Sequence, residues 1–366
     1  MTTLLPVPSA PSRVLVVSGS VGAGHDGAAR ELADRLRADG VTVDIVDFLD
    51  TVPRWLSMLW REGYTTSVDH VPGAFQLLFS RIEHEGPVWR IARALCRRGS
   101  ARLVRWLEEG EYDLVVSTYP LASQALGDLR ARGICRVPVI TYLTDPAAHR
   151  CWVHPAVDLH LTVTGATAVE GTAAYGVPLV AAGPLVPARF ARAVPAADLR
   201  RLRTELGLPA GRPVALLVGG SLGVGDLLPS VADVAAAGLV PVVLCGRNEG
   251  LRRELAAVPG AIALGWRDDV HVLLQVADVM VHNAGGLSFT EALVAGLPAV
   301  TYRPIPGHGR ANAGVLAEAG LAPWPRTAAE LAAALHAQVR GGRSLGALGD
   351  PADQVLALLP AHSLAA

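Results

Sequence analysis

The sequence contains no lysine: all 32 of its basic residues are arginine, and 33 acidic residues leave a net charge of −1 over 366 residues. A balanced charge of this kind predicts no general affinity for nucleic acid. There are only four cysteines, Cys96, Cys135, Cys151 and Cys245, and they show no paired spacing. We therefore expect reduced thiols in a cytoplasmic protein.

Long apolar runs are also missing from the sequence. No uninterrupted run reaches the roughly 18 residues that a membrane-spanning helix requires. The first dozen residues lack the basic start and the apolar core of a signal peptide. Any contact with a membrane is therefore expected to come from its surface.

Apolar residues nevertheless make up 51% of the chain, which is enough for two hydrophobic cores. Short β-branched runs alternate with segments of helical spacing, and this pattern predicts parallel sheets covered by helices on both faces. The first strands are expected at 13–19, 41–46, 114–117, 139–143 and 159–163, with a helix at 28–39. A second set follows a Pro- and Arg-rich stretch and is expected at 214–218, 241–244, 261–264, 279–282 and 299–302.

The predicted fold class is α/β, with two doubly wound, Rossmann-like domains facing a cleft. We place an N-terminal domain at 1–187 and a C-terminal domain at 188–349, and we expect 350–366 to return to the N-terminal domain. Ligands of such sheets bind beyond the C-terminal ends of the strands. Loops from both domains should therefore meet at the cleft.

The most informative local pattern is residues 282–293, where the paired glycines Gly285–Gly286 join a strand to a helix. Backbone N–H groups and the dipole at a helix N-terminus attract phosphate, and glycines allow it to approach closely. Glu291, one turn inside the helix, can accept hydrogen bonds from both hydroxyls of a ribose. The alternative is an ordinary turn in which Ser288 or Thr290 caps the helix and Glu291 is solvated.

The turn after the first strand, residues 18–29, is also rich in glycine. It gives a weak match to a dinucleotide-binding fingerprint, for which Asp47 would supply the acidic residue. His25 stands at the start of the following helix, where the dipole disfavours imidazolium. A neutral His25 can accept a proton near pH 7 and so activate an alcohol. The alternative is a polar residue that is only hydrogen-bonded within the turn.

Several segments occur in the order and approximate spacing of one known family. They are Gly22–Ala29, Tyr142–Asp145 with His149 and Trp152–Pro155, Gly219–Ser221, Gly265–Trp266, Gly285–Ala292, Leu297–Pro298, and Pro304–Gly307 continuing to Asn312. The chain resembles the monogalactosyldiacylglycerol synthase family and the bacterial processive diacylglycerol glucosyltransferases, which are relatives of the peptidoglycan transferase that makes lipid II. The resemblance covers nearly the whole chain.

This resemblance implies the GT-B fold and inverting transfer of a sugar from a UDP-sugar to an alcohol, without a cofactor. His25 would be the base that deprotonates the acceptor hydroxyl, and Glu291 would hold the ribose. The main chain of the glycine turns would bind the diphosphate, at Gly220, Ser221, Gly285, Gly286, Leu287 and Ser288. The remaining donor contacts would be the backbone at Trp266 and Arg267, which would read the uracil, and His308, Arg310 and Asn312.

On the acceptor side the resemblance implies contacts from Gly24, Tyr119, Asp145, His149 and Trp152. Asp145 would orient an acceptor hydroxyl or His25 itself, as carboxylates orient bases elsewhere. A metal site is an alternative use of four side chains in this stretch: Asp145, His149, His154 and His160. Pro146 and Pro155 disfavour it because they break any helix that would align these groups.

No Asp-x-Asp motif occurs, so we expect no metal, and we expect the helix dipole and N–H groups to stabilise the leaving group. Arg247 is a further candidate for that task. The alternative for Arg247 is a solvated surface charge.

Residues 53–109 form a long insertion that is rich in apolar, aromatic and arginine side chains. The apolar and aromatic ones are Trp55, Met58, Leu59, Trp60, Tyr64, Phe75, Leu77, Leu78, Phe79, Trp89 and Trp106, and the arginines on or near one helical face are Arg90, Arg93, Arg97, Arg98 and Arg102. Tryptophan beside arginine suits the anionic headgroup layer of a bilayer. The alternative is that these aromatic side chains pack inward on the sheet.

The chain departs from the family at two places. His308, Gly309 and Arg310 stand where the family usually carries a glutamine and an acidic residue that touch the donor sugar. Arg310 would pair with the carboxylate of a uronic acid donor, or it would point to solvent. Tyr119 stands where the family has a histidine. Sugar and acceptor therefore both remain open.

The sequence thus predicts an inverting glycosyltransferase that uses a UDP-sugar and a lipid or lipid-linked acceptor. We expect it to be cytoplasmic and peripherally bound to the anionic inner face of the cell membrane, with no nucleic-acid partner. One alternative is a tailoring glycosyltransferase of a secondary metabolite, with a soluble or prenylated acceptor. Two others are a UDP-sugar epimerase and a binding module without catalysis.

Overall fold

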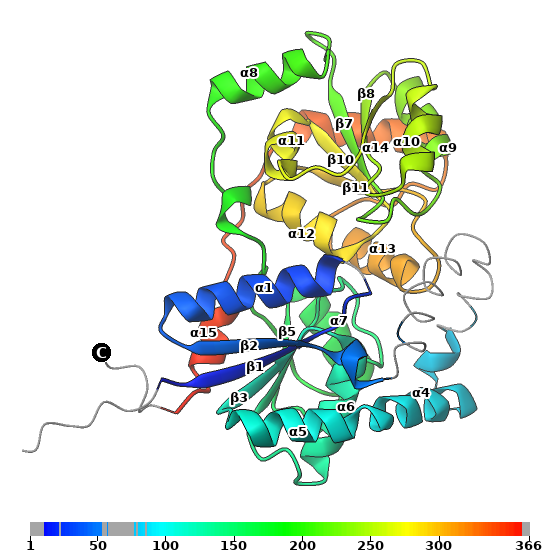
Figure 1. Ribbon diagram of the computed structural model, residues 1–366. Helices are drawn as coiled ribbons and strands as arrows, with labels where there is room; N and C mark the ends of the chain where they lie inside the picture. The colour runs from blue at the N-terminus through cyan, green and yellow to red at the C-terminus, as the bar shows by residue number, and fades with distance from the viewer. Residues whose placement is uncertain are drawn as a thin grey trace, which may run out of the picture.

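The computed structural model describes residues 11–21, 23–52, 57, 77, 80–84 and 86–360, and it shows two α/β domains stacked one above the other (Figure 1). The N-terminal domain contains a 6-stranded sheet of order β2-β1-β3-β4-β5-β6, parallel throughout. Its strands are β1 (Arg13–Ser18), β2 (Thr42–Asp47), β3 (Leu114–Ser117), β4 (Val139–Tyr142), β5 (Leu159–Thr162) and β6 (Leu179–Ala181).

The C-terminal domain contains a 5-stranded sheet of order β11-β10-β7-β8-β9, which is also parallel. Its strands are β7 (Val214–Val218), β8 (Val240–Leu244), β9 (Ile262–Leu264), β10 (Val279–His282) and β11 (Ala299–Thr301). The prediction of two doubly wound parallel sheets is therefore confirmed.

Helices cover both faces of each sheet (Figure 1). Those of the N-terminal domain are α1 (Ala23–Ala38), η1 (Phe48–Thr51), α4 (Pro87–Arg98), α5 (Ser100–Gly110), α6 (Pro120–Ala131) and α7 (Gly165–Tyr175). The later helices are η2 (Ala188–Phe190), α8 (Ala196–Glu205), α9 (Leu227–Ala236), α10 (Glu249–Ala256), α11 (Val270–Val276), α12 (Gly286–Val294), α13 (His308–Glu318), α14 (Ala328–Gly341) and α15 (Pro351–Leu356).

Strand β1 shows why the first sheet needs two helical layers. Val14 and Val16 point into a core shared with α1, whereas Leu15 and Val17 point into a core shared with α5 and α6. All four side chains are fully buried. An uninterrupted apolar run is the pattern expected for a strand that is covered on both faces.

The chain returns to the N-terminal domain at its end. Helix α15 contacts α1, and Ala352 and Val355 lie in the same core as Val14. Arg35 of α1 donates to Asp350 at 2.9 Å and to the carbonyl of Val186 at 2.9 Å. One arginine therefore binds both chain segments that cross between the domains. The limits 1–187, 188–349 and 350–366 themselves stay a prediction.

Three features differ from the sequence-based expectations or lie outside the described residues. Helix α1 begins at Ala23 and not at residue 28, and strand β6 was not predicted. The expected membrane contacts at Trp55, Met58, Leu59, Trp60, Tyr64, Phe75, Leu78 and Phe79 lie outside the described residues. Among the described residues, no helix is long and apolar enough to cross a membrane.

Candidate active site

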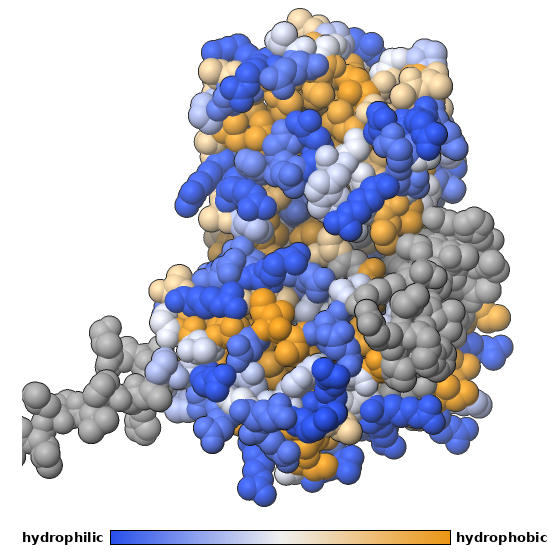
Figure 2. Space-filling view, in the orientation of Figure 1, coloured by the Kyte–Doolittle hydropathy of each residue, from blue (hydrophilic) through white to orange (hydrophobic). Residues whose placement is uncertain are grey.

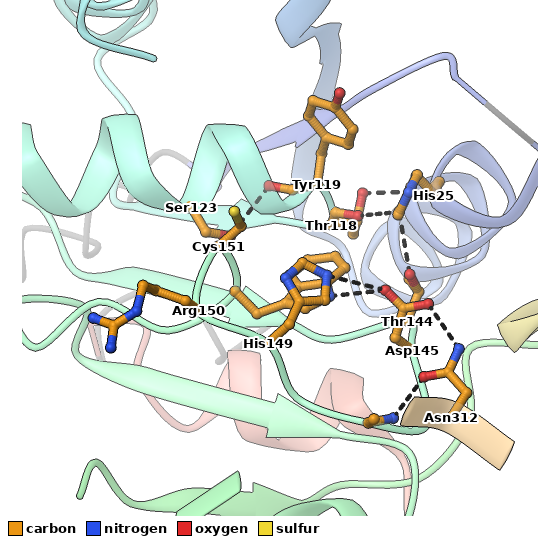
Figure 3. A network of polar contacts seen from close by, with 12 residues as sticks. His25, Thr118, Tyr119, Ser123, Thr144, Asp145, His149, Arg150, Cys151 and Asn312 are labelled. Carbon is orange, nitrogen blue, oxygen red and sulfur yellow. Dashed lines mark hydrogen bonds and ion pairs between the residues drawn. The ribbon is translucent and has the colours of Figure 1, made fainter. Parts of the chain in front are cut away.

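His25 lies in the first turn of α1, at the C-terminal end of the first sheet. Its Nδ1 atom is 2.9 Å from the carbonyl oxygen of Thr118 and 3.1 Å from Oγ1 of Thr144 (Figure 3). A carbonyl oxygen can only accept, so Nδ1 carries the proton of the neutral ring. The opposite nitrogen, Nε2, is therefore the one that can accept a proton.

Burial lowers the pKa of His25 below its ordinary value, and the charge of Asp145 and the hydrogen bond with Thr118 oppose this shift in part. The ring is also held from its sides, because its centroid is 5.2 Å from that of Tyr119 and 5.7 Å from that of Trp152. His25 is thus a neutral, oriented imidazole at neutral pH, which is the form a general base requires.

Asp145 follows Thr144 directly in the chain. Its carboxylate accepts a hydrogen bond from the indole Nε1 of Trp152 at 2.9 Å, and Nε2 of His149 lies 3.6 Å away. Burial by itself would raise the pKa of Asp145, but the hydrogen bond with His149 and the charges of His308, His149 and His25 bring it well below its usual range. Asp145 therefore carries a negative charge at the centre of this histidine cluster.

The expected roles of Trp152 and Tyr119 as acceptor contacts need correction. Trp152 is fully buried and Tyr119 is 4% exposed, so neither offers an open surface to an acceptor. Trp152 instead supports Asp145 through its indole N–H. Tyr119 supports the ring of His25 and packs against Gly19, where a side chain would overlap the tyrosine ring.

The histidines that suggested a metal site separate in the structure. His149 lies beside Asp145, whereas Nε2 of His154 is 3.5 Å from Asp128 and the ring of His160 accepts from the backbone N–H of His154. Within the described part of the chain, no group of three or more potential ligands is placed to hold a metal ion.

The glycine turn of the C-terminal domain forms the N-terminus of α12, with Gly285 as the residue before the first helical turn. The hydroxyl of Thr290 donates back to the carbonyl of Gly286 at 2.8 Å, and no side chain caps the helix. The alternative of a turn capped by Ser288 or Thr290 is therefore wrong. The N–H groups at this helix start remain available to an anion.

Glu291 lies one turn further along α12 and is partly buried. Burial raises its pKa to about 7, and the charge of Arg189 opposes this shift. Arg189 also lines a cavity of about 360 Å³ between the interdomain linker and α11. This cavity does not reach His25 or the glycine turn, so it lies apart from the candidate site.

The two halves of the site meet directly. A methyl group on Gly286 would overlap the carbonyl oxygen of Thr144, and Leu287 packs against Gly24 and Gly27 of α1. Thr144 thus contacts His25 through its hydroxyl and the glycine turn through its carbonyl. The structure brings together the base and the helix start that were recognised separately in the sequence.

Two further loops lie at the same end of the second sheet. Gly220 has a positive φ of 72°, and the backbone N–H of Arg247 donates to the carbonyl of Ser221 at 3.0 Å. The guanidinium of Arg247 lies 4.7 Å from the ring centroid of Trp266, whose side chain is 49% exposed. Arg247 is therefore exposed, as in the alternative of a surface charge, and it also stacks on the loop expected to read the base.

The side chain of Arg267 is paired with Asp269, with Nε 2.7 Å from its carboxylate. Only the backbone of Arg267 is left for the expected contact with uracil.

Helix α13 carries the last group of expected donor residues. His308 opens this helix, and burial lowers its pKa while the nearby charge of Asp145 raises it. Arg310 is exposed. Asn312 is fully buried, and its amide joins Asp145, Ala147 and Ala284. The expectation that Asn312 faces the donor sugar therefore needs correction, because its hydrogen-bonding groups are already occupied.

The arginine face of the insertion is smaller than expected. Arg93 and Arg97 of α4 both donate to Asp128 of α6, whose side chain is 7% exposed. Trp89 is buried beneath Arg150, so its aromatic ring packs inward as in the alternative interpretation. The other three arginines of this face are exposed and do not pair with Asp128: Arg90, Arg98 and Arg102.

Sequence reasoning found His25, the glycine turn and Glu291, but it missed Thr118 and Thr144. These two residues follow β3 and β4, at the sheet edge where ligands of parallel sheets bind. Their position at the ends of predicted strands was the available signal for both, and Thr144 also lies in the matching segment Tyr142–Asp145.

Comparison with known proteins agrees with this architecture. The family model for monogalactosyldiacylglycerol (MGDG) synthase matches residues 25–177. A processive diacylglycerol beta-glucosyltransferase of Bacillus cereus is 25% identical over 312 residues, covering 82% of this chain and 79% of that protein. A protein of the same name from Bacillus thuringiensis is 26% identical over 347 residues, covering 91% of this chain and 87% of that protein.

Solved structures show the same fold. The MurG protein of Acinetobacter baumannii aligns with a TM-score of 0.57 at 17% identity, covering 95% of this chain and 99% of that chain. The glycosyltransferase SnogD of Streptomyces nogalater aligns with a TM-score of 0.54 at 18% identity, with the same coverage of 95% and 99%. The chain is thus similar to monogalactosyldiacylglycerol synthases over residues 25–177 and to processive diacylglycerol glucosyltransferases over most of its length, and it has the GT-B fold of glycosyltransferases.

Proposed function

We propose that this protein transfers a sugar from a UDP-sugar to a hydroxyl of a lipid or lipid-linked acceptor, with inversion at the anomeric carbon. The observation that carries the proposal is the direct contact between the turn that holds His25 and the helix start at Gly286. A neutral base and an anion-binding helix N-terminus are the two parts that such a transfer needs. The names of the curated relatives support a diacylglycerol-like acceptor.

The proposed reaction follows from the tautomer of His25. Nε2 takes the proton of the acceptor hydroxyl, and the oxygen forms a bond to the anomeric carbon from the face opposite UDP. The bond between that carbon and the phosphate oxygen breaks, and its electron pair leaves with UDP. The N–H groups from Gly286 to Ser288 and the dipole of α12 then stabilise the charge of the leaving diphosphate.

The remaining donor contacts are assigned by position. Glu291 accepts hydrogen bonds from the ribose hydroxyls, and these bonds replace the solvent that the buried carboxyl has lost. The loops at Ser221 and Trp266 lie at the same sheet edge and complete the nucleotide site. Arg310, exposed in the first turn of α13, is the residue through which a donor with a carboxylate would be selected.

We further propose that the outer face of α4 contacts the anionic inner surface of the cell membrane. Ile91 is 62% exposed on this helix, between the exposed residues Arg90 and Arg98, and Leu77 is 55% exposed. Figure 2 shows hydrophilic and hydrophobic side chains next to one another over α4. A helix face that mixes apolar and cationic side chains suits the headgroup layer.

The test is a transfer assay with purified protein, a panel of UDP-sugars that includes a UDP-uronic acid, and vesicles containing diacylglycerol. We expect UDP release that requires both donor and acceptor, and a higher melting temperature with UDP. The absence of any UDP-dependent thermal shift would contradict the donor assignment. Release of UDP with a soluble alcohol but not with vesicles would favour the tailoring enzyme.

A further inference from the structure

Asn312 lies at the boundary between the domains, on α13 of the C-terminal domain. Its Oδ1 atom accepts a hydrogen bond from the backbone N–H of Ala147 at 2.9 Å. Its Nδ2 atom lies 3.0 Å from the carbonyl oxygen of Ala284. The same atom lies 3.5 Å from Oδ1 of Asp145 (Figure 3). One fully buried amide therefore bridges two residues of the N-terminal domain and one of its own.

The partners of Asn312 fix the orientation of its amide. The N–H of Ala147 requires an oxygen, and the carbonyl of Ala284 requires an N–H donor, so the amide cannot be turned over without losing both bonds. The second hydrogen of Nδ2 is left for the carboxylate of Asp145, whose Oδ1 atom lies 3.5 Å away. Removing this side chain would leave buried backbone groups without partners, which is costly.

Each partner of Asn312 belongs to a different part of the site. Ala284 is the residue before the glycine turn, and its φ of 70° is a left-handed conformation that non-glycine residues rarely adopt. Asp145 is joined by the peptide bond to Thr144, which contacts both His25 and Gly286. The amide of Asn312 is thus bonded directly to the turn that precedes the anion-binding helix start and to the segment that holds the base.

We propose that Asn312 is a positioning residue that sets the register between the glycine turn and His25 when the domains are together. This inference rests on the proposed function of those two elements and adds a role for a residue that itself touches no substrate. Transfer requires His25 to lie on the acceptor side of an anomeric carbon whose diphosphate is held by the turn. A shift of about 1 Å between reacting groups is enough to lose much of the rate.

Hydrogen exchange without any ligand tests the bridge itself. Asn312→Ala should make the backbone amide of Ala147 exchange at least about tenfold faster, because its buried acceptor is gone. The matched control is Asn248→Ala, since Asn248 accepts from Leu251 at 3.0 Å and donates to Gly223 at 3.3 Å within the C-terminal domain. Exchange at Ala147 should be unchanged in this control. Unchanged exchange in folded Asn312→Ala would overturn the inference.

Kinetics then separate positioning from donor contact. Asn312→Ala should lower kcat about tenfold or more, because the loss of the buried hydrogen bonds to Ala147 and Ala284 lets the glycine turn shift against His25, and it should leave the KM for the donor within about twofold. Asn312→Asp keeps the oxygen for Ala147 but loses the donor to Ala284, so it should also be slow. A defect confined to the donor KM would make Asn312 a donor contact and overturn the inference. If the wild-type protein neither bound nor used a UDP-sugar, the proposed function would fail while the exchange result would still decide the bridge.

Discussion

The Nδ1 atom of His25 lies 2.9 Å from the carbonyl oxygen of Thr118, and this contact determines which ring nitrogen can act as a base. Because the carbonyl holds the proton on Nδ1, Nε2 keeps its lone pair. The base is therefore oriented by main chain, and no carboxylate is required for that task. Asp145, which a Ser-His-Asp analogy would place behind the histidine, bonds to Trp152 instead.

Removing the imidazole should abolish the chemistry without abolishing donor binding. We expect His25→Ala to lower kcat by about 10² to 10⁴, the usual contribution of a general base, with little change in the affinity for UDP. The measurement is UDP release in the vesicle assay, combined with calorimetric titration of UDP. His336→Ala is the control, since His336 lies on α14 and bonds to the carbonyl of Ala237 away from the site. Substantial turnover by His25→Ala would remove the assignment of the base.

The pH profile should report the lowered pKa of His25. The base acts only when neutral, so activity is lost as the pH falls through the pKa of the folded protein. Burial lowers that pKa, and kcat/KM should therefore fall on the acid side at a pH below the ordinary value of 6.5. The charge of Asp145 raises the pKa of His25, so Asp145→Asn should move the acid limb to still lower pH. An acid limb above 6.5 in the wild-type protein would contradict this account.

Glu291 should behave in the opposite sense because burial raises its pKa from 4.5 to about 7. The folded state binds the proton more tightly than the unfolded state, so stability falls as the pH rises from 4.5 through 7. Glu291→Gln removes this charge and should raise the melting temperature at pH 8 by about 2 °C or more while weakening UDP binding. Glu249→Gln is the control, as Glu249 is exposed and paired with Arg252. A Glu291→Gln protein that bound UDP as tightly as wild type would refute the ribose assignment.

The close contact of Gly286 with Thr144 can be tested by adding a methyl group at Gly286. Gly286→Ala adds a methyl group where the carbonyl oxygen of Thr144 lies, so we expect the domains to be held apart and kcat to fall at least about tenfold. Small-angle scattering should show a larger radius of gyration. Gly314→Ala on α13 is matched, because its added methyl meets no atom within 4 Å and should only stabilise the helix. Equal activity of the two variants would show that this contact does not limit transfer.

Much of this architecture could be predicted from the sequence, because apolar runs and glycine turns are local signals. The run Val14–Val17 indicated a strand buried on both faces, and the turn at Gly285–Gly286 indicated a helix start suited to phosphate. The support of His25 could not be predicted in this way. Thr118 and Thr144 are 93 and 119 residues from His25 in sequence, and only the order of the strands brings them together.

Side-chain direction was the other unpredictable feature. Trp152 lies in a motif that the family places at the acceptor cleft, yet its ring is fully buried and its N–H supports Asp145. Arg93 and Arg97 have the same spacing as the other exposed arginines of α4, but both are paired with a single buried acid on α6, and Arg93 is half-buried there. A helical pattern indicates a charged face but does not locate the partner of each charge.

The pairing of Arg93 and Arg97 with Asp128 changes how the membrane proposal has to be tested. Reversing Arg93 or Arg97 would place a like charge beside buried Asp128 and would lower stability, so weaker membrane binding of such variants would not be informative. The variant that isolates the surface is Arg90→Glu with Arg98→Glu, because both side chains are exposed.

We expect this Arg90/Arg98 double variant to lose most of its flotation with vesicles rich in anionic lipid, at about 1 kcal/mol per charge removed near the surface, with an unchanged melting temperature. High salt should weaken wild-type flotation in the same direction. The control is Arg200→Glu with Arg340→Glu, which places the same charge change on exposed positions of the C-terminal domain. If both double variants floated equally well, the exposed face of α4 would not be the membrane contact, and a soluble acceptor would become the better account of the site.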